Sequence, residues 1–345
     1  MSGKHVVVVG CGNIGSHLLP HLARMRRLEA VTIIDPDRYG RSNLVTQDIA
    51  GRDVGMPKAT AQARRLRGIN PALAVLPLPA AVESVPLGLL RADAILACLD
   101  SRAARQFVNE AAWRLGVPWI DAGVEGGGLL ARVTVYVPGS GNACLECGWD
   151  DRDYAALGQR YSCAGAEKAP PSGSPSTLGA LAASVQAIEC AKLLGGERAP
   201  GREVLVDAAF HKLYLSARTR NSECRFDHRT WRIEPLAGLG LTLARALARG
   251  CPLTAAGRRF VRAVACAGCG AVRPVLRFEI PGELPRRCKR CGGAMLPPAP
   301  EAPYAVSAAD VPRKTLAARL ARLGIRAGDV IGLGAARFEI TGERR

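Results

Sequence analysis

Long apolar runs are the feature that this sequence most clearly lacks. No stretch of about 18 apolar residues, the length that crosses a bilayer, occurs among its 345 residues. The valines at 6–9 are too few for the core of a secretory signal peptide. Only 22% of the residues are charged and 48% are hydrophobic, which argues against a disordered, collagen-like or coiled-coil chain. We therefore expect a globular, cytoplasmic protein of two or three domains without a membrane partner.

Acidic residues and aromatic rings are scarce in the last third of the chain. The net charge is +17, and residues 235–345 hold 19 of the 47 basic side chains but only 7 of the 30 acidic ones. A basic module of this kind can bind a nucleic-acid backbone. Its four aromatic residues are too scattered for a stacking platform on which bases could lie. We favour a module that recruits an acidic protein partner over one that binds nucleic acid.

Cysteines, in contrast, are numerous, with 12 in the chain. In a reducing compartment, paired Cys-x-x-Cys units hold metal more often than they form disulfides. Two such pairs stand 18 residues apart in the basic module, and this spacing is typical of a zinc ribbon: Cys266 with Cys269, and Cys288 with Cys291. The sequence predicts a structural zinc site there, with all four thiolates used as ligands.

The N-terminal 35 residues have the pattern of a dinucleotide-binding β-α-β unit. A β-branched run at 5–9 predicts a buried strand, and the run at 30–34 predicts a second one that ends at Asp35. Between them lie Gly10, Gly12 and Gly15, which let the backbone approach a phosphate at a helix N-terminus. Asp35, 20 positions after Gly15, would bind ribose hydroxyls.

Strand and helix patterns alternate up to about residue 206, which predicts an α/β fold with a Rossmann-like doubly wound sheet. We predict helices at 58–67, 102–115 and 177–194, and strands at 72–76, 94–99, 117–120 and 203–206. The predicted domains are an α/β domain at 1–234 with a turn-rich crossover loop at 150–176, a linker helix and zinc-ribbon module at 235–299, and a small basic segment at 300–345.

The charged residues after the glycine turn do not suit a dehydrogenase. Asp35 and Asp37 are followed by Lys58 and by Asp100, which stands at the end of a predicted strand. A lysine and a magnesium-binding aspartate beside a phosphate loop favour nucleotidyl transfer, in which charge on the α-phosphate must be neutralised.

Over about residues 5–230 the chain resembles the ThiF/MoeB and ubiquitin-activating (HesA/MoeB/ThiF) adenylyltransferases, and in style it is closest to a bacterial activating enzyme for a ubiquitin-like protein. The matching motifs are Gly10-x-Gly12-x-x-Gly15, Asp35-x-Asp37, Ser42-Asn43-Leu44-x-x-Gln47, Lys58, Asp100-x-x-x-x-Arg105, Asp121-Ala-Gly123, Cys144-x-x-Cys147 and the helix that holds Gln186. The resemblance implies ATP-dependent adenylation of the C-terminal glycine of a ubiquitin-fold protein by an enzyme that is commonly a homodimer.

The same resemblance assigns roles in the nucleotide site. It implies that Asp35 holds the ATP ribose, that Lys58 contacts the phosphates and that Asp100 binds Mg²⁺. It also implies that Asn43 and Gln47 line the triphosphate site, to which the three glycines, Asp37 and Arg105 belong as well. One residue departs from the family pattern, because Thr46 stands where an arginine is usual. Three explanations stay open: Arg38 or Arg41 substitutes, a second subunit supplies an arginine, or phosphate binding is weak.

Cys144 and Cys147 make only half of a tetrahedral metal site. The family closes this site with a second pair late in the domain, and here that place holds Cys224 and His228. We predict one structural zinc on these four residues. The alternative is that Cys224 and His228 are incidental, since a Cys-x₃-His pattern is weak by itself.

Cys163 lies in the predicted crossover loop, where ubiquitin-activating members carry a cysteine that takes the acyl group from the adenylate as a thioester. A nearby Lys168 and a helix N-terminus would lower the pKa of such a thiol. We predict Cys163 as the nucleophile and a conjugating enzyme as the next acceptor. Alternatives are a cysteine without a role, a sulfur-carrier adenylyltransferase of thiamin or molybdopterin type without a thioester step, and a non-enzymatic nucleic-acid-binding protein.

Overall fold

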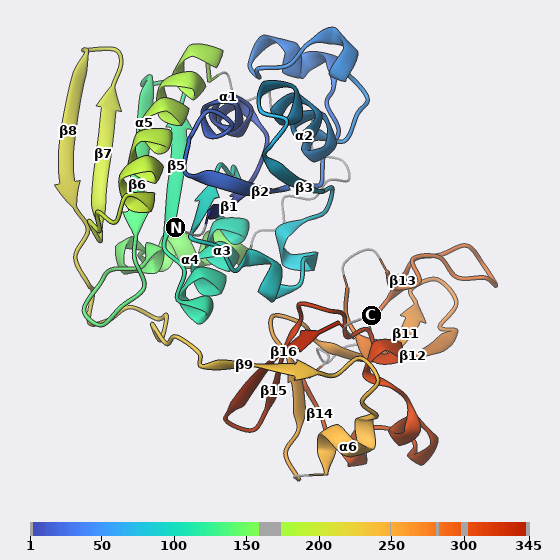
Figure 1. Ribbon diagram of the computed structural model, residues 1–345. Helices are drawn as coiled ribbons and strands as arrows, with labels where there is room; N and C mark the ends of the chain where they lie inside the picture. Colours follow the sequence, from blue (N-terminus) through green and yellow to red (C-terminus); the bar gives the residue numbers. More distant parts are fainter. Residues whose placement is uncertain (1–2, 159–173, 249, 281–282, 298–302, 343–345) are drawn as a thin grey trace. The chain divides into compact units, whose positions relative to one another are not determined.

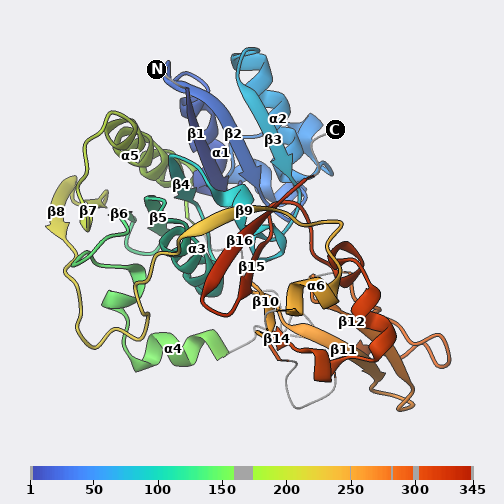
Figure 2. The ribbon, with the colours of Figure 1, turned by 60° about the horizontal axis from the view of Figure 1, so that its bottom comes forward.

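The computed structural model describes residues 3–158, 174–248, 250–280, 283–297 and 303–342. The chain divides into two compact units (Figures 1 and 2). The first unit comprises Met1–Val82 and Leu90–Thr230, and the second comprises Glu83–Leu89 and Trp231–Arg345. A short segment from the first half of the chain therefore folds with the C-terminal unit, in which the Gly88 N–H donates to the Gly328 carbonyl at 2.7 Å.

The first unit is built on an eight-stranded sheet with the order β3-β2-β1-β4-β5-β6-β7-β8. The first five strands of this order are parallel and the last three are antiparallel to their neighbours. This confirms the predicted Rossmann-like α/β class. The strands are β1 (Lys4–Val9), β2 (Leu28–Ile34), β3 (Ala74–Leu78), β4 (Ala94–Ala97), β5 (Trp119–Glu125), β6 (Leu130–Tyr136), β7 (Arg202–Asp207) and β8 (Lys212–Ala217).

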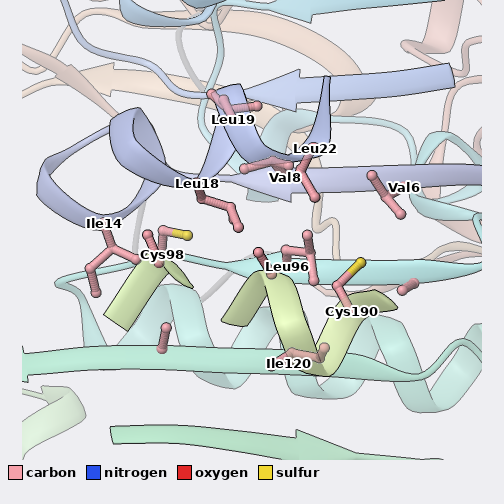
Figure 3. Packing of buried hydrophobic residues seen from close by; sticks show 14 of the residues in the cluster. Val6, Val8, Ile14, Leu18, Leu19, Leu22, Leu96, Cys98, Ile120 and Cys190 are labelled. Atoms are coloured by element: carbon pink, nitrogen blue, oxygen red, sulfur yellow. The ribbon is translucent and has the colours of Figure 1, made fainter. Parts of the chain in front are cut away.

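Helices cover both faces of this sheet (Figure 1). Side chains of α1 (Asn13–Leu22), α2 (Lys58–Ile69) and α5 (Ser176–Leu194) belong to one buried cluster, while α3 (Arg102–Leu115) packs against β4 and β5 from the other face. Because a parallel strand is covered on both sides, β1 reads as an uninterrupted run of valines, all of which are buried. In Figure 3, Leu18 and Leu22 of α1 lie against Val8 of β1.

The helix α5 has the length and composition of a membrane span, with 19 residues and a mean hydropathy of 1.3. Its burial within this unit accounts for that composition. Leu178, Ala182 and Cys190 are all buried in the core, and the Gln186 amide donates to the carbonyls of Ala97 and Ile120 on β4 and β5. The apolar character of α5 is thus used in packing against the sheet and α1.

The second unit contains a five-stranded sheet, β14-β10-β15-β16-β9, and a three-stranded sheet, β12-β11-β13. The predicted domain boundary at residue 300 does not separate two folding units, because strands on either side of it pair in one sheet. β10 pairs with β14 and β15, and β9 pairs in parallel with β16. The elements are β9 (Ile233–Ala237), α6 (Leu243–Leu247), β10 (Leu253–Ala255), β11 (Phe260–Cys266), β12 (Val272–Phe278), β13 (Met295–Leu296), β14 (Ala305–Val306), β15 (Val330–Leu333) and β16 (Ala336–Thr341).

Candidate active site and metal clusters

The register of the parallel strands gathers the predicted nucleotide residues at one sheet edge. Val9 of β1 lies beside Ile34 of β2 and beside Ala97 of β4. The chain therefore leaves all three strands at the same edge, where the glycine turn, Asp35 and the segment that leads to Asp100 begin. The carboxyl edge of such a sheet, where the strand order reverses, is where α/β proteins bind their ligands.

The glycine turn between β1 and α1 needs glycine at two of its three positions. A Cβ on Gly10, which has a φ of +96°, would lie 2.3 Å from the Cys98 carbonyl oxygen, and one on Gly15 would lie 2.0 Å from the Gly10 oxygen. A Cβ on Gly12, directly before α1, would meet no atom within 4 Å. The backbone is thus uncrowded at Gly12, as the approach of an anion to a helix N-terminus requires.

Asp35 joins the end of β2 to the glycine turn. Its side chain is buried, and its two oxygens accept hydrogen bonds from the Cys11 N–H at 2.6 Å and the Asp37 N–H at 2.8 Å. Burial raises the pKa of this carboxyl, while the Cys11 N–H and the Lys58 charge act in the opposite direction. The residue predicted to hold the ribose is therefore fixed at the glycine turn by backbone contacts.

Lys58, the first residue of α2, lies next to Asp37. Its Nζ atom is 3.0 Å from an Asp37 carboxylate oxygen, and its backbone N–H donates to the Asp37 carbonyl at 2.8 Å. The lysine side chain is only 10% exposed, whereas that of Asp37 is 64% exposed. A largely buried cation with one solvent-exposed partner can exchange that partner for a phosphate oxygen.

Tyr39 holds the same region together and was missed from the sequence. Its ring is buried, its hydroxyl donates to the Cys11 carbonyl at 3.0 Å, and the Gln62 amide donates to that hydroxyl at 2.8 Å. Burial raises the Tyr39 pKa far above its ordinary value, so the hydroxyl stays protonated and keeps donating. The available signal was an aromatic residue with a polar tip within the otherwise charged segment after β2.

The side chains of Asn43 and Gln47 differ in whether they have a hydrogen-bond partner. Asn43 accepts a hydrogen bond from the Gly40 N–H at 2.8 Å and so caps the 3₁₀ turn Arg41–Val45. The buried Oε1 atom of Gln47 has no hydrogen-bond partner in the described part of the chain. Since a buried polar atom without a partner is costly, a ligand that donates a hydrogen bond to Gln47 would relieve that cost.

Arg38 and Arg41, the two candidates to replace the family arginine that Thr46 lacks, differ in whether their guanidinium is already bound. Arg38 donates to the Gly55 carbonyl at 2.8 Å, so its guanidinium is already engaged. Arg41 is exposed and has no ion-pair partner among the residues that the structure describes. Of the two, Arg41 is the one whose charge is available to a phosphate.

Asp100 and Arg105 lie on either side of the start of α3. Asp100 is exposed and makes no ion pair within the described ranges. Arg105 instead donates through Nε to Asp121 of β5 at 2.9 Å, and the Asp121 side chain is fully buried. A free carboxylate at a strand end suits a hard cation. The Arg105 guanidinium, predicted to bind nucleotide, is held by an ion pair inside the unit.

Cys144, Cys147, Cys224 and His228 come together as predicted, with their ligand atoms all within 4.8 Å of one another. The Cys144 and Cys224 sulfurs are 3.7 Å apart, and the Cys147 sulfur is 3.3 Å from Nε2 of His228. Two sulfurs on a tetrahedral zinc at about 2.3 Å would lie about 3.8 Å apart. Nδ1 of His228 is 2.6 Å from the Phe226 carbonyl, which directs Nε2 toward the sulfurs. This donor set fits a zinc ion.

The second cluster is formed by Cys266, Cys269, Cys288 and Cys291, whose sulfurs also lie within 4.8 Å of one another. The Gly268 and Arg290 N–H groups donate to the sulfurs of Cys266 and Cys288, both at 3.4 Å. Such backbone N–H groups stabilise thiolates, the form that binds metal. The predicted ribbon thus has the arrangement of a four-thiolate site.

Glu146, between Cys144 and Cys147 of the first cluster, was also missed from the sequence. It is buried and accepts hydrogen bonds from Gln106 at 3.1 Å, Asn109 at 3.4 Å and the Tyr154 hydroxyl at 3.0 Å. Tyr154 lies on α4 (Asp151–Gly158), within the segment predicted as a turn-rich loop. The metal cluster and the start of the crossover segment are therefore connected through one buried carboxylate.

The predicted nucleophile Cys163 and its neighbour Lys168 lie outside the described residues. The thioester role of Cys163 stays a prediction.

Comparison with known proteins identifies relatives of the first unit. The ThiF family profile matches residues 1–226. The sulfur carrier protein ThiS adenylyltransferase of Escherichia coli K12 is 29% identical over 225 residues, which cover 64% of this chain and 84% of that protein. The SAMP-activating enzyme E1 of Haloferax volcanii is 31% identical over 213 residues, which cover 59% and 73%.

Other relatives are matched over a smaller share of their own length. Human ubiquitin-like modifier-activating enzyme 7 is 33% identical over 146 residues, which cover 39% of this chain but only 14% of that protein. Among solved structures, E. coli MccB with ATP has a TM-score of 0.53 and 24% identity, with 64% of this chain and 65% of that chain covered. This likeness shows the fold. The family match ends before the basic module.

The two strand-end aspartates provide a matched test of the site. Asp35→Ala leaves the buried Cys11 N–H without an acceptor, so we expect the free energy of unfolding of this unit to fall by about 1–3 kcal/mol. Asp100→Ala removes an exposed carboxylate and should change it by less than about 0.5 kcal/mol. Urea titration followed by tryptophan fluorescence measures both, and equal effects would contradict the assignment.

Proposed function

This chain belongs to the ThiF family, and we propose that it is an ATP-dependent adenylyltransferase that activates the C-terminal glycine of a ubiquitin-like protein. The observation that carries the proposal is the meeting of an open glycine turn, a fixed Asp35, the Lys58–Asp37 pair and a free Asp100 at one sheet edge. Several relatives are named for adenylating carriers or activating modifiers of this kind. On the resemblance alone, we also propose a cytoplasmic homodimer.

In the proposed reaction, the substrate's terminal carboxylate attacks the α-phosphorus of ATP. The bond from that phosphorus to the β-phosphate oxygen breaks, pyrophosphate leaves, and an acyl-adenylate forms. Lys58 would stabilise the charge that develops on the phosphate, and Gln47 would accept a hydrogen bond from the bound nucleotide or its water. Asp100 would hold Mg²⁺, which when bound neutralises phosphate charge. Arg41 would take the place of the missing family arginine.

The exchange of pyrophosphate into ATP tests the adenylation step. With a ubiquitin-fold protein encoded by a neighbouring gene and ending in glycine, we expect Lys58→Ala and Asp100→Ala each to lower the exchange rate by about 100-fold or more. Lys314→Ala, an exposed lysine of the second unit, should leave the rate unchanged. Full exchange by Asp100→Ala would show that the site is assigned wrongly.

The fate of the acyl-adenylate distinguishes two candidate functions. We propose transfer to Cys163 as a thioester and then to a conjugating enzyme, on the family resemblance. The second candidate is a sulfur-carrier adenylyltransferase, which passes the adenylate on directly. An observation in its favour is that E. coli ThiS adenylyltransferase and molybdopterin-synthase adenylyltransferase are covered over 84% and 87% of their lengths.

A non-reducing gel decides between these two. Under the thioester proposal, ATP and the ubiquitin-fold protein produce an adduct that dithiothreitol removes, and Cys163→Ala abolishes the adduct while pyrophosphate exchange continues. Cys251→Ala serves as the matched cysteine control and should retain the adduct. A dithiothreitol-sensitive adduct that survives Cys163→Ala rejects Cys163 as the nucleophile. No adduct beside normal exchange rejects the thioester and leaves the sulfur-carrier function.

We also propose that each cysteine cluster holds one structural Zn²⁺. We expect two zinc ions per chain by elemental mass spectrometry of the purified protein. Cys144→Ser and Cys269→Ser should each lose one ion, because each removes a ligand from a different cluster. Cys190→Ser, in the apolar core and outside both clusters, should keep both ions. A protein with one ion or none would contradict the proposal.

A further inference from the structure

We propose that the three-stranded ribbon of the second unit is a docking surface for an acidic segment of a partner protein. The surface, here called the basic ribbon surface, consists of Arg286, Arg287, Lys289 and Arg290, all exposed. It lies outside the part of the chain that the ThiF family profile matches. The proposal goes beyond adenylation and can fail without affecting it.

Acidic side chains compensate little of the charge on this surface, and a zinc ion on the four thiolates would offset only two of its positive charges. Two acidic residues, Glu279 and Glu283, occur among the described residues between 260 and 296, and Glu283 pairs with Arg277 at 2.6 Å. Within the described residues, Arg286, Lys289 and Arg290 make no ion pair. Uncompensated cations on one small module attract an anionic partner and speed its association.

Backbone hydrogen bonds order the turn that carries Lys289 and Arg290. The Gly292 N–H donates to the Cys288 carbonyl at 2.9 Å, and the Cys288 N–H donates to the Gly293 carbonyl at 2.8 Å. These bonds close a tight turn that carries Lys289 and Arg290 on its exposed side. Because the turn is already ordered, less conformational entropy is lost when a partner binds.

An exposed apolar pair lies on the same small sheet. Val272 of β12 and Leu296 of β13 both pair with Ala265 of β11, so their side chains point to the same face. They are 68% and 56% exposed. Apolar contacts supply binding energy that surface charges alone do not. The pair therefore favours an acidic partner segment that also carries aliphatic side chains.

The described ribbon lacks two of the elements with which proteins often bind nucleic acid, an open aromatic platform and a helix. Phe260 and Phe278 are buried and pack edge to face at 5.2 Å, so neither ring is open to a base. Tyr304, which follows the ribbon, has the Arg259 guanidinium over its ring at 5.3 Å. No helix lies between β11 and β13 in the described residues that could enter a major groove. A protein partner fits these features better.

Binding of a fluorescein-labelled peptide, made of glutamates with two leucines, tests the proposal on the full-length protein. Fluorescence anisotropy at physiological ionic strength should show binding. Combining Arg286→Glu, Lys289→Glu and Arg290→Glu should raise the Kd by about tenfold or more. The control combines Arg313→Glu, Lys314→Glu and Arg319→Glu, which make the same charge change on exposed residues of the same unit, and should change the Kd less than about twofold.

Four results would overturn the proposal. The first is no binding of the peptide, and the second is an equal loss in both triple variants, which would reflect net charge alone. The third is tighter, ribbon-dependent binding of an oligo(dT) strand or a DNA duplex than of the peptide. The fourth is loss of zinc from the ribbon variant, because the cations would then serve to neutralise the four thiolates. Pyrophosphate exchange should be unchanged in both variants, so adenylation is tested separately.

Discussion

The parallel pairing of β1 with both β2 and β4 is the constraint on which the candidate active site depends. It makes three chain segments leave the sheet at one edge, and the Asp35 carboxylate then fixes two of them to each other. Gly10 and Gly15 are required because the turn passes so close to the Cys98 carbonyl and to itself. The geometry of the candidate phosphate site therefore follows from strand register and close backbone packing.

Features that depend on local spacing could be predicted from the sequence. The helix predicted at 102–115 coincides with α3, because Ser101 caps its start and Gly116, with a φ of +69°, ends it. The cluster of four cysteines was also predicted, since Cys-x-x-Cys pairs are a local pattern, whereas Cys224 and His228 were assigned to the other cluster from the family resemblance. Asp35 could be placed because a β-α-β unit sets its distance from the glycine turn.

Features that depend on distant contacts could not be predicted. Tyr39 and Glu146 belong to no sequence motif that would mark them. Tyr39 acquires its role when the fold brings Cys11 and Gln62 beside it, and Glu146 when α4 does so. The five-stranded sheet of the second unit joins β9 to β16 from the far end of the chain, a parallel pairing without a sequence signature. For the same reason the ion pair between Arg105 and the buried Asp121 was not foreseen. The first unit thus carries a candidate nucleotide site whose motifs are local in the sequence, whereas the organisation of the second unit is set by long-range pairing.

The most direct test of the account is to identify the acyl-adenylate itself. The protein would be incubated with Mg-ATP, pyrophosphatase and a ubiquitin-fold protein that ends in glycine, and the partner's intact mass would be measured at once in acid. The account predicts that the partner gains the mass of one adenylyl group, which is AMP less one water, located at its C-terminal glycine by fragmentation. ATP bound by the protein without AMP on any such partner, or AMP attached elsewhere, would contradict it.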